Sequence, residues 1–304
     1  MQYIYAYETS TPAQVSQFAQ LLEKSIHSVK NQYLYLLLCI REVANFVETD
    51  AKIKAGKFIK TDKDKNFNTK LLSNIIIQYL NNDASFLLEI KNAQTQTLID
   101  EDNIRSWYKI FIQSKAYQDY LNNENEFNLE ADRAIIKYLL DVVLLEDENF
   151  LTIIEELFTN WTEDAEYVVE AVHEVLEKSK NGLKLHFEKG NLKDKFKELT
   201  QFGIDLFNET IGHKKENQKL IEPKLKNWEA DRLASVDLIL IRMALSEFLY
   251  FPSIPAKVTI NEYLDIAKEY STPKSKDFIN GVLDSLMKDL KNDNLLNKTG
   301  RGLL

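Results

Sequence analysis

The sequence predicts an all-α protein, and three observations support this fold class. The 304 residues include 8 Gly and 5 Pro, whereas average usage would give about 21 and about 15. No Pro stands between Pro12 and Pro223. Apolar side chains recur every three or four residues through most of the chain, which is the helical period. Because sheets and barrels need frequent turns marked by Gly and Pro, β and α/β folds become improbable.

The N-terminal half is expected to hold one long helix and then several shorter ones. Thr11 and Pro12 resemble an N-cap followed by Pro at the first helical position, and the helical pattern continues to about Thr49 or beyond. Residues 52–70 carry seven lysines against two aspartates, which indicates a basic loop. Further helices are predicted at residues 69–80, 84–94, 101–121, 129–145 and 147–159.

The C-terminal half is expected to be built around one almost wholly apolar helix. The run from Val236 to Tyr250, with Ser235 as a candidate cap, has hardly any polar face and so belongs in the middle of a bundle. Pro252 and Pro255 then break the helix. Other helices are predicted at residues 162–178, 192–211, 214–228 and 256–270, and a last helix starts at Thr272-Pro273 and carries Phe278, Val282, Leu286 and Leu290 on one stripe.

The charge is distributed unevenly along the chain. The formal net charge is −9, which by itself argues against a nucleic-acid binder. Residues 124–177 form an acidic block with 16 acidic residues against Arg133 and Lys137, a net of −14, so the remainder carries +5. Solvated helix faces account for most such blocks; a surface that docks a basic protein or repels anions is the alternative.

The usual motifs of catalysis and metal binding are absent from the sequence. There is no glycine-rich phosphate loop and no paired cysteine, and the single Cys39 lies in an apolar run. Glu170 and His173 have the Glu-x-x-His spacing of di-iron bundles, but no second pair exists. No export signal or membrane-spanning run is recognisable. We therefore expect a soluble, cytoplasmic, non-catalytic protein without metal, cofactor or small-molecule substrate.

From about Phe196 to Leu290 the chain resembles the NusB family of transcription antitermination factors. The segments that carry the resemblance are residues 221–225 (IEPKL), 227–233 (NWEADRL), 236–247 (VDLILIRMALSE), 254–262 (IPAKVTINE), 267–268 (AK) and 278–284 (FINGVLD). Their order and spacing are close to those of the family, although Ser246 replaces its usual Tyr. The match covers about a third of the chain.

The resemblance implies a fold of two helical-bundle subdomains, here with extra helices in the N-terminal half. It also implies binding of boxA-type single-stranded RNA from rRNA leaders together with the ribosomal protein NusE, in support of the RNA polymerase elongation complex. Two alternatives remain open. One is a detached RNA-binding module of an rRNA cytosine methyltransferase, and the other is a helical scaffold that docks proteins only.

The resemblance further points to particular residues. Lys274, Lys276 and Phe278 are expected to bind RNA through phosphates and a partly exposed stacking ring, together with Tyr5, which resembles the Tyr that ends the family's first helix. Asp231, Asp237 and Glu247 are expected to contact the basic partner. Asn280 and Gly281 are expected to have structural roles, with Gly281 allowing a neighbouring helix to approach closely.

The domain organisation follows from these observations. We expect an N-terminal helical region at residues 1–185, a NusB-type helical domain at 186–291 and a disordered basic tail at 292–304. The family usually begins with an arginine-rich segment, whereas here nothing basic precedes Tyr5. We therefore expect that the first helix is truncated and that an upstream basic segment is missing.

Overall fold

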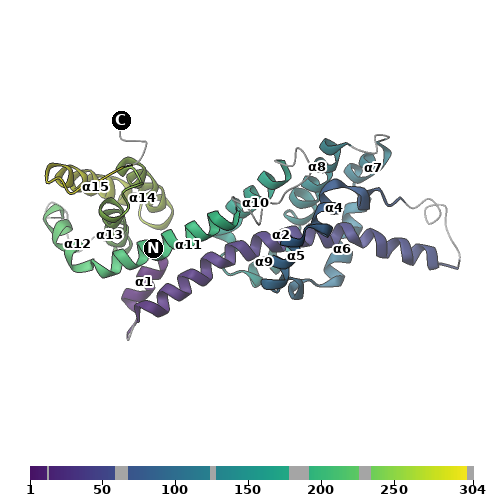
Figure 1. Cartoon of the computed structure of the whole chain (residues 1–304), viewed down its shortest axis with the longest axis horizontal. Coiled ribbons are helices and arrows are strands. Elements are labelled where there is room, and N and C mark those ends of the chain that lie inside the picture. The colour runs from purple at the N-terminus through teal and green to yellow at the C-terminus, as the bar shows by residue number, and fades with distance from the viewer. Residues whose placement is uncertain (12–13, 59–67, 124–127, 178–191, 226–233, 300–304) are drawn as a thin grey trace. The chain divides into compact units, whose positions relative to one another are not determined.

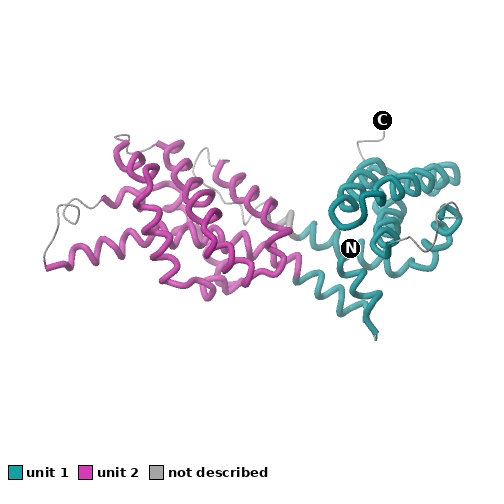
Figure 2. Tube along the Cα trace, turned by 180° about the vertical axis from the view of Figure 1, so that it is seen from behind, with its two compact units in different colours: residues 1–24, 197–304 teal, residues 25–196 magenta. Residues whose placement is uncertain are grey.

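The computed structural model describes residues 1–11, 14–58, 68–123, 128–177, 192–225 and 234–299. Every regular element within these ranges is a helix, which confirms the predicted all-α class (Figure 1). The chain forms two compact units, unit 1 with residues 1–24 and 197–304 and unit 2 with residues 25–196 (Figure 2). The N-terminal helix therefore belongs to the same unit as the C-terminal helices. The expected boundary at residue 185 lies outside the described residues and stays a prediction.

Unit 2 is built around residues 25–56 of the long helix α2 (Val15–Gly56), whose first residues belong to unit 1. Nine consecutive residues from Gln32 to Ile40 are buried, so the helix is covered on all sides over this stretch. The predicted long helix is confirmed and runs from Val15 to Gly56. Lys52 and Lys54 are therefore helical rather than part of the predicted basic loop. Pro12, the expected first helical position, lies outside the described residues. They form ion pairs one turn back with Glu48 and Asp50, which helps the helix to continue. Residues 59–67 of the predicted basic loop lie outside the described residues.

The remaining helices of unit 2 surround α2, and their starts have a common local cause. In six of them an Asn, Asp or Ser side chain accepts a hydrogen bond from a backbone amide of the first turn, which satisfies groups that the helix itself leaves free. The helices and their capping residues are α4 (Ile75–Asn82, Asn74), α5 (Ala84–Asn92, Asp83), α6 (Glu101–Gln113, Asp100), α7 (Lys115–Asn122, Ser114), α8 (Leu129–Tyr138, Asn128) and α9 (Glu148–Leu157, Asp147).

Three predicted helices of unit 2 are interrupted in the structure. The segment 69–80 divides at Asn74, which follows the 3₁₀ turn η1 (Lys70–Ser73) and caps α4. The segment 101–121 divides into α6 and α7 at Ser114, whose extended backbone ends one helix while its hydroxyl caps the next. The segment 129–145 begins as α8 and continues as the π-helical turn η3 (Leu139–Leu144). Helix α10 (Trp161–Glu177) completes the unit, and short 3₁₀ turns lie at η1 (Lys70–Ser73) and η2 (Thr95–Leu98).

Unit 1 is centred on α13 (Ser235–Tyr250), of which eleven residues are buried. As predicted, α13 is a central helix, and it contacts both α14 (Ala256–Tyr270) and α15 (Ser275–Asn292), which also contact each other. The N-terminal helix α1 (Gln2–Thr9) and α12 (Lys214–Ile221) also contact α13. Helix α11 (Leu192–Gly212) adds Leu206 and Phe207 to this core.

Some ends of the helices in unit 1 differ from prediction. Helix α12 stops at Ile221 and passes into the 3₁₀ turn η4 (Glu222–Lys224), because Pro223 cannot continue the α-helical hydrogen bonds. Ser235 is the first residue of α13 and makes no capping bond. The segment expected to be a disordered tail is tied down as far as Thr299, since Lys298 Nζ donates to the carbonyls of Glu247 and Phe251 and the Thr299 amide donates to that of Pro252.

Candidate nucleic-acid and partner interface

The turn between α14 and α15 is built on a buried carboxylate. Asp237 of α13 is 4% exposed, and it accepts hydrogen bonds from the hydroxyls of Ser271 and Ser275, the latter at 2.7 Å. The Ser275 hydroxyl also accepts a bond from the Thr272 amide. Asp237 therefore fixes the start of α15 from inside the unit. This corrects the expectation that Asp237 contacts a partner, because both of its oxygens are occupied inside the fold.

The first turn of α15 presents two lysines to solvent. Lys274 and Lys276 are exposed on either side of the buried Ser275. Both can reach a phosphate, and the free amides and dipole of a helix N-terminus favour an anion there. Asn280 and Gly281 are also exposed, and no atom lies within 4 Å of a Cβ added at Gly281. The expected close approach of a neighbouring helix at Gly281 is therefore wrong.

Phe278 does not have the exposure expected of a stacking residue. Its side chain is 4% exposed and belongs to the core of unit 1 with Val282 and Leu286. The one-turn spacing of these three residues puts them on the buried face of α15. The expectation of a partly exposed ring is corrected: Phe278 holds α15 in place, and the exposed charged residues around it are Lys274, Lys276 and Asp277.

Glu247 is likewise an internal group. It is 5% exposed and accepts hydrogen bonds from the hydroxyls of Thr259, at 2.6 Å, and Tyr263, at 3.3 Å. Burial raises the pKa of Glu247, although these two bonds and the charge of Lys298 act in the opposite direction. The expected contact between Glu247 and a partner is corrected, since the carboxyl group joins α13 to α14. Asp231, the third expected partner residue, lies outside the described residues.

Tyr5 lies on the surface of α1, as its expected role requires, with 45% of its side chain exposed. The helix is held by Ile4, which is buried, and by an ion pair between Glu8 and Arg242 of α13. Arg242 donates from both terminal nitrogens, with Nη2 2.7 Å from Glu8 Oε2, and Lys214 Nζ lies 2.8 Å from Glu8 Oε1. Burial would raise the pKa of Glu8, but the bonds from Arg242 and Lys214 outweigh it and lower that pKa.

Sequence reasoning missed this Glu8–Arg242 clamp. A signal was present, because Arg242 is the one basic residue in an apolar helix, and a buried guanidinium needs an anionic partner. The identity of that partner was not readable, since Glu8 is 234 positions away. Also missed was the stacked pair of His213 and Tyr250, whose ring centroids are 4.5 Å apart. Their sequence positions share no pattern that would bring them together.

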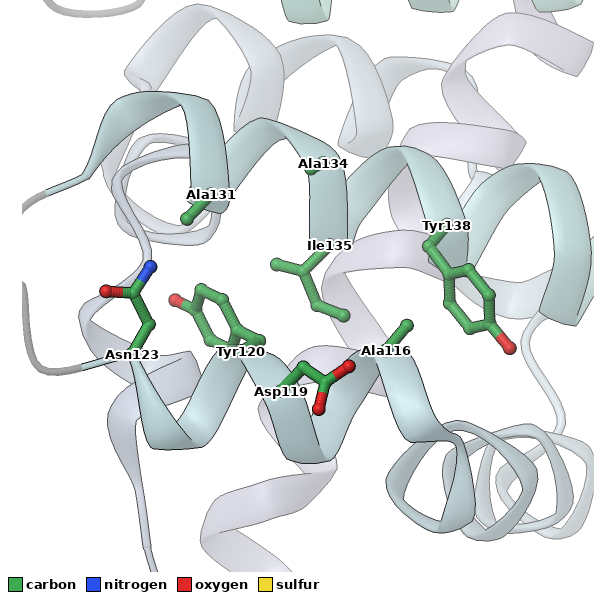
Figure 3. A pocket seen from close by; sticks show the side chains of 8 residues that line it. All are labelled: Ala116, Asp119, Tyr120, Asn123, Ala131, Ala134, Ile135 and Tyr138. Atoms are coloured by element: carbon green, nitrogen blue, oxygen red, sulfur yellow. The ribbon is translucent and has the colours of Figure 1, made fainter.

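Unit 2 has a pocket of about 310 Å³ between α7 and α8 (Figure 3). The pocket exists because three of its lining side chains are short, those of Ala116, Ala131 and Ala134. Tyr120 and Tyr138 flank it, and Asp119 is the one carboxylate among its lining side chains. Its lining side chains include no second carboxylate that would form an acid–base pair with Asp119.

The described residues show no metal centre or membrane segment. Across the described ranges no three His, Cys, Asp or Glu side chains are grouped as metal ligands. His173, half of the Glu-x-x-His pair, has its Nε2 2.7 Å from Asp141 Oδ1. In the same ranges no helix combines the length and apolarity needed to cross a bilayer.

Comparisons with known proteins connect this geometry to a family. The model of the NusB family matches residues 163–288, a span that includes α13, α14 and most of α15. The transcription antitermination protein NusB of Salinibacter ruber (strain DSM 13855 / M31) is 47% identical over 103 residues, which cover 34% of this chain and 64% of that protein. No solved structure matches.

Two further relatives show the same partial coverage. The transcription antitermination protein NusB of Chloroherpeton thalassium (strain ATCC 35110 / GB-78) is 41% identical over 103 residues, 34% of this chain and 49% of that protein. The protein of the same name from Koribacter versatilis (strain Ellin345) is 45% identical over 98 residues, 32% of this chain and 67% of that protein. The chain thus spans between about half and two thirds of the length of these relatives. On this similarity, the chain belongs to the NusB family.

Proposed function

We propose that this chain is a non-catalytic transcription antitermination factor of the cytoplasm. It binds boxA-type single-stranded RNA together with NusE and assists the RNA polymerase elongation complex during rRNA transcription. The observation that carries the proposal is the membership of the NusB family, with relatives named as antitermination proteins at 41–47% identity.

The exposed groups of unit 1 support a role in RNA binding. Lys274 and Lys276 supply two positive charges at the N-terminal end of an 18-residue helix, where phosphates bind favourably. Tyr5 supplies an exposed ring on a helix that is fixed to the core of unit 1, and aromatic rings are the usual platforms for single-stranded bases. Asp231 remains our candidate for a contact with the basic partner.

The test measures the binding of a fluorescent boxA-type RNA, with and without NusE, at about 50 and about 200 mM salt. Each lysine that contacts a phosphate of single-stranded RNA contributes about 0.7 to the slope of log affinity against log salt. The Lys274→Ala/Lys276→Ala variant should therefore lower that slope by about 1.4. Tyr5→Ala should weaken binding about tenfold or more, which is the loss expected for one stacked base.

A matched control exists on the same helix. Lys288 and Lys291 are exposed at the opposite end of α15, so Lys288→Ala/Lys291→Ala removes the same charge away from the proposed contact. Equal losses of slope in the two double variants would contradict the proposed contact. RNA binding that is absent with NusE would favour a protein-docking scaffold, and RNA binding that NusE does not change would favour a methyltransferase-type module.

A further inference from the structure

Unit 2 carries a surface groove between α9 and α10, here called the α9–α10 groove, which the proposed function does not use. It has a volume of about 560 Å³. Trp161, Ala165 and Val169 of α10, each four residues apart, form one side, and Leu151 of α9 with Leu145 forms the other. Trp161 is buried at the base, whereas the other four remain partly exposed. The groove therefore offers a continuous apolar strip at the surface.

The rim of the groove is acidic. Glu166 and Glu170 line it from α10, one helical turn apart, and both are exposed. On α9, Glu148 and Glu155 are three residues before and four residues after Leu151, which places them beside it on the helix surface. Within the described ranges no Lys or Arg side chain forms an ion pair with Glu166 or Glu170.

The sequence around the groove extends this imbalance. Residues 138–177 contain twelve Asp or Glu residues and no Lys or Arg. His173, at the far end of the groove, already faces the carboxylate of Asp141 at 2.7 Å. An RNA strand or another anion would be repelled here. A ligand that fills the groove must cover apolar carbon and also bring positive charge.

We propose that the α9–α10 groove docks an amphipathic helix rich in Lys and Arg from a partner protein. The groove residues of α10 follow the helical period over the thirteen residues from Trp161 to His173, a length of about 18 Å. A partner helix of about three turns matches this length, with apolar side chains at helical spacing on the strip and cations toward the rim. The proposal is independent of RNA binding by unit 1.

The test uses a fluorescent synthetic peptide of about 14 residues with Leu at helical spacing and Lys elsewhere. We expect it to bind the full chain at a single site, more weakly as salt is raised. A scrambled peptide of the same composition cannot present an apolar stripe and should bind at least about tenfold more weakly. Equal binding of the two peptides would overturn the proposal.

Two variants locate the site. Glu166→Lys/Glu170→Lys reverses the rim and should weaken binding about tenfold, whereas Glu101→Lys/Glu156→Lys changes the net charge equally at exposed positions outside the groove and should not. Ala165→Phe fills the strip without altering charge and should also abolish binding, provided that circular dichroism shows an unchanged melting temperature.

Three outcomes would refute the proposal. One is an equal effect of the two charge reversals, which would indicate attraction to net charge alone. Another is peptide binding that survives Ala165→Phe in a folded protein. The third is self-association of the chain in analytical ultracentrifugation that the peptide reverses, because the groove would then be a contact between two copies.

Discussion

The Glu8–Arg242 clamp should determine how firmly α1 is held on unit 1. Glu8→Ala would leave the Arg242 side chain, which is 6% exposed, with a bond from its Nε to the Leu238 carbonyl at 3.3 Å. Removing one member of a buried ion pair costs roughly 3–5 kcal/mol. Because the Glu8 side chain is still 19% exposed to solvent, we expect a loss of unfolding free energy at the lower end of this range, about 3 kcal/mol.

Hydrogen–deuterium exchange of the α1 amides measures this loss locally. A free-energy loss of about 3 kcal/mol corresponds to exchange that is faster by about a hundredfold or slightly more, and it should be concentrated in Gln2–Thr9. The RNA affinity of Glu8→Ala should also fall, because the loosened helix α1 carries Tyr5.

Two controls make the result specific. Lys214→Met removes the exposed member of the network, whose side chain is 49% exposed, and should cost less than about 1 kcal/mol. Glu8→Leu/Arg242→Met replaces both buried charges with apolar groups and should recover part of the loss. Exchange in Glu8→Ala that stays within about threefold of wild type would refute the reasoning, because the clamp would then contribute less than about 1 kcal/mol.

Three further predictions concern buried polar groups. Burial raises the pKa of Glu247 above its ordinary 4.5. The wild type should therefore gain stability relative to Glu247→Gln as the pH falls from 7 through the raised pKa, and the gain should be complete below 4.5. Melting temperatures of the two proteins that differ equally at pH 7 and pH 5 would contradict this. Asp237→Ala should destabilise the start of α15 by roughly 1–2 kcal/mol, because the hydroxyls of Ser271 and Ser275 lose their acceptor, and exchange should quicken in the first turn of α15 rather than in α14. Cys39 is buried, and burial raises the pKa of its thiol, so a thiol reagent at pH 8 should react only after unfolding in urea; rapid reaction of the folded protein would show that Cys39 becomes exposed.

The helices of this chain were largely predictable, because apolar periodicity records which face is buried. Their interruptions were harder to foresee. Ser114 looks like one more polar residue in the pattern of 101–121, and whether it continues a helix or caps the next depends on how α6 and α7 pack. Pro223, in contrast, was a visible signal for the end of α12 that the periodicity of 214–228 concealed.

The candidate site was only partly predictable for a related reason. Lys274 and Lys276 are exposed as expected because they flank the buried face of α15. Asp237 and Glu247 are buried because α13 is covered on nearly every side, so its charged residues need internal partners. The apolar run of α13 indicated that Asp237 and Glu247 would be buried. It did not reveal their partners Ser275 and Thr259, which come from other helices.

The composition of unit 1 from both ends of the chain has a consequence for biosynthesis. Residues 25–196 form a continuous stretch of the chain, so all of unit 2 is made before residues 197–304. Residues 1–24 are made before residues 197–304 and must wait for them before their core exists. At about 5–20 residues per second, synthesis of the 280 residues from 25 to 304 takes roughly 14–56 s. During that interval the apolar side of α1, with Ile4, lacks the C-terminal helices that cover it in the folded unit.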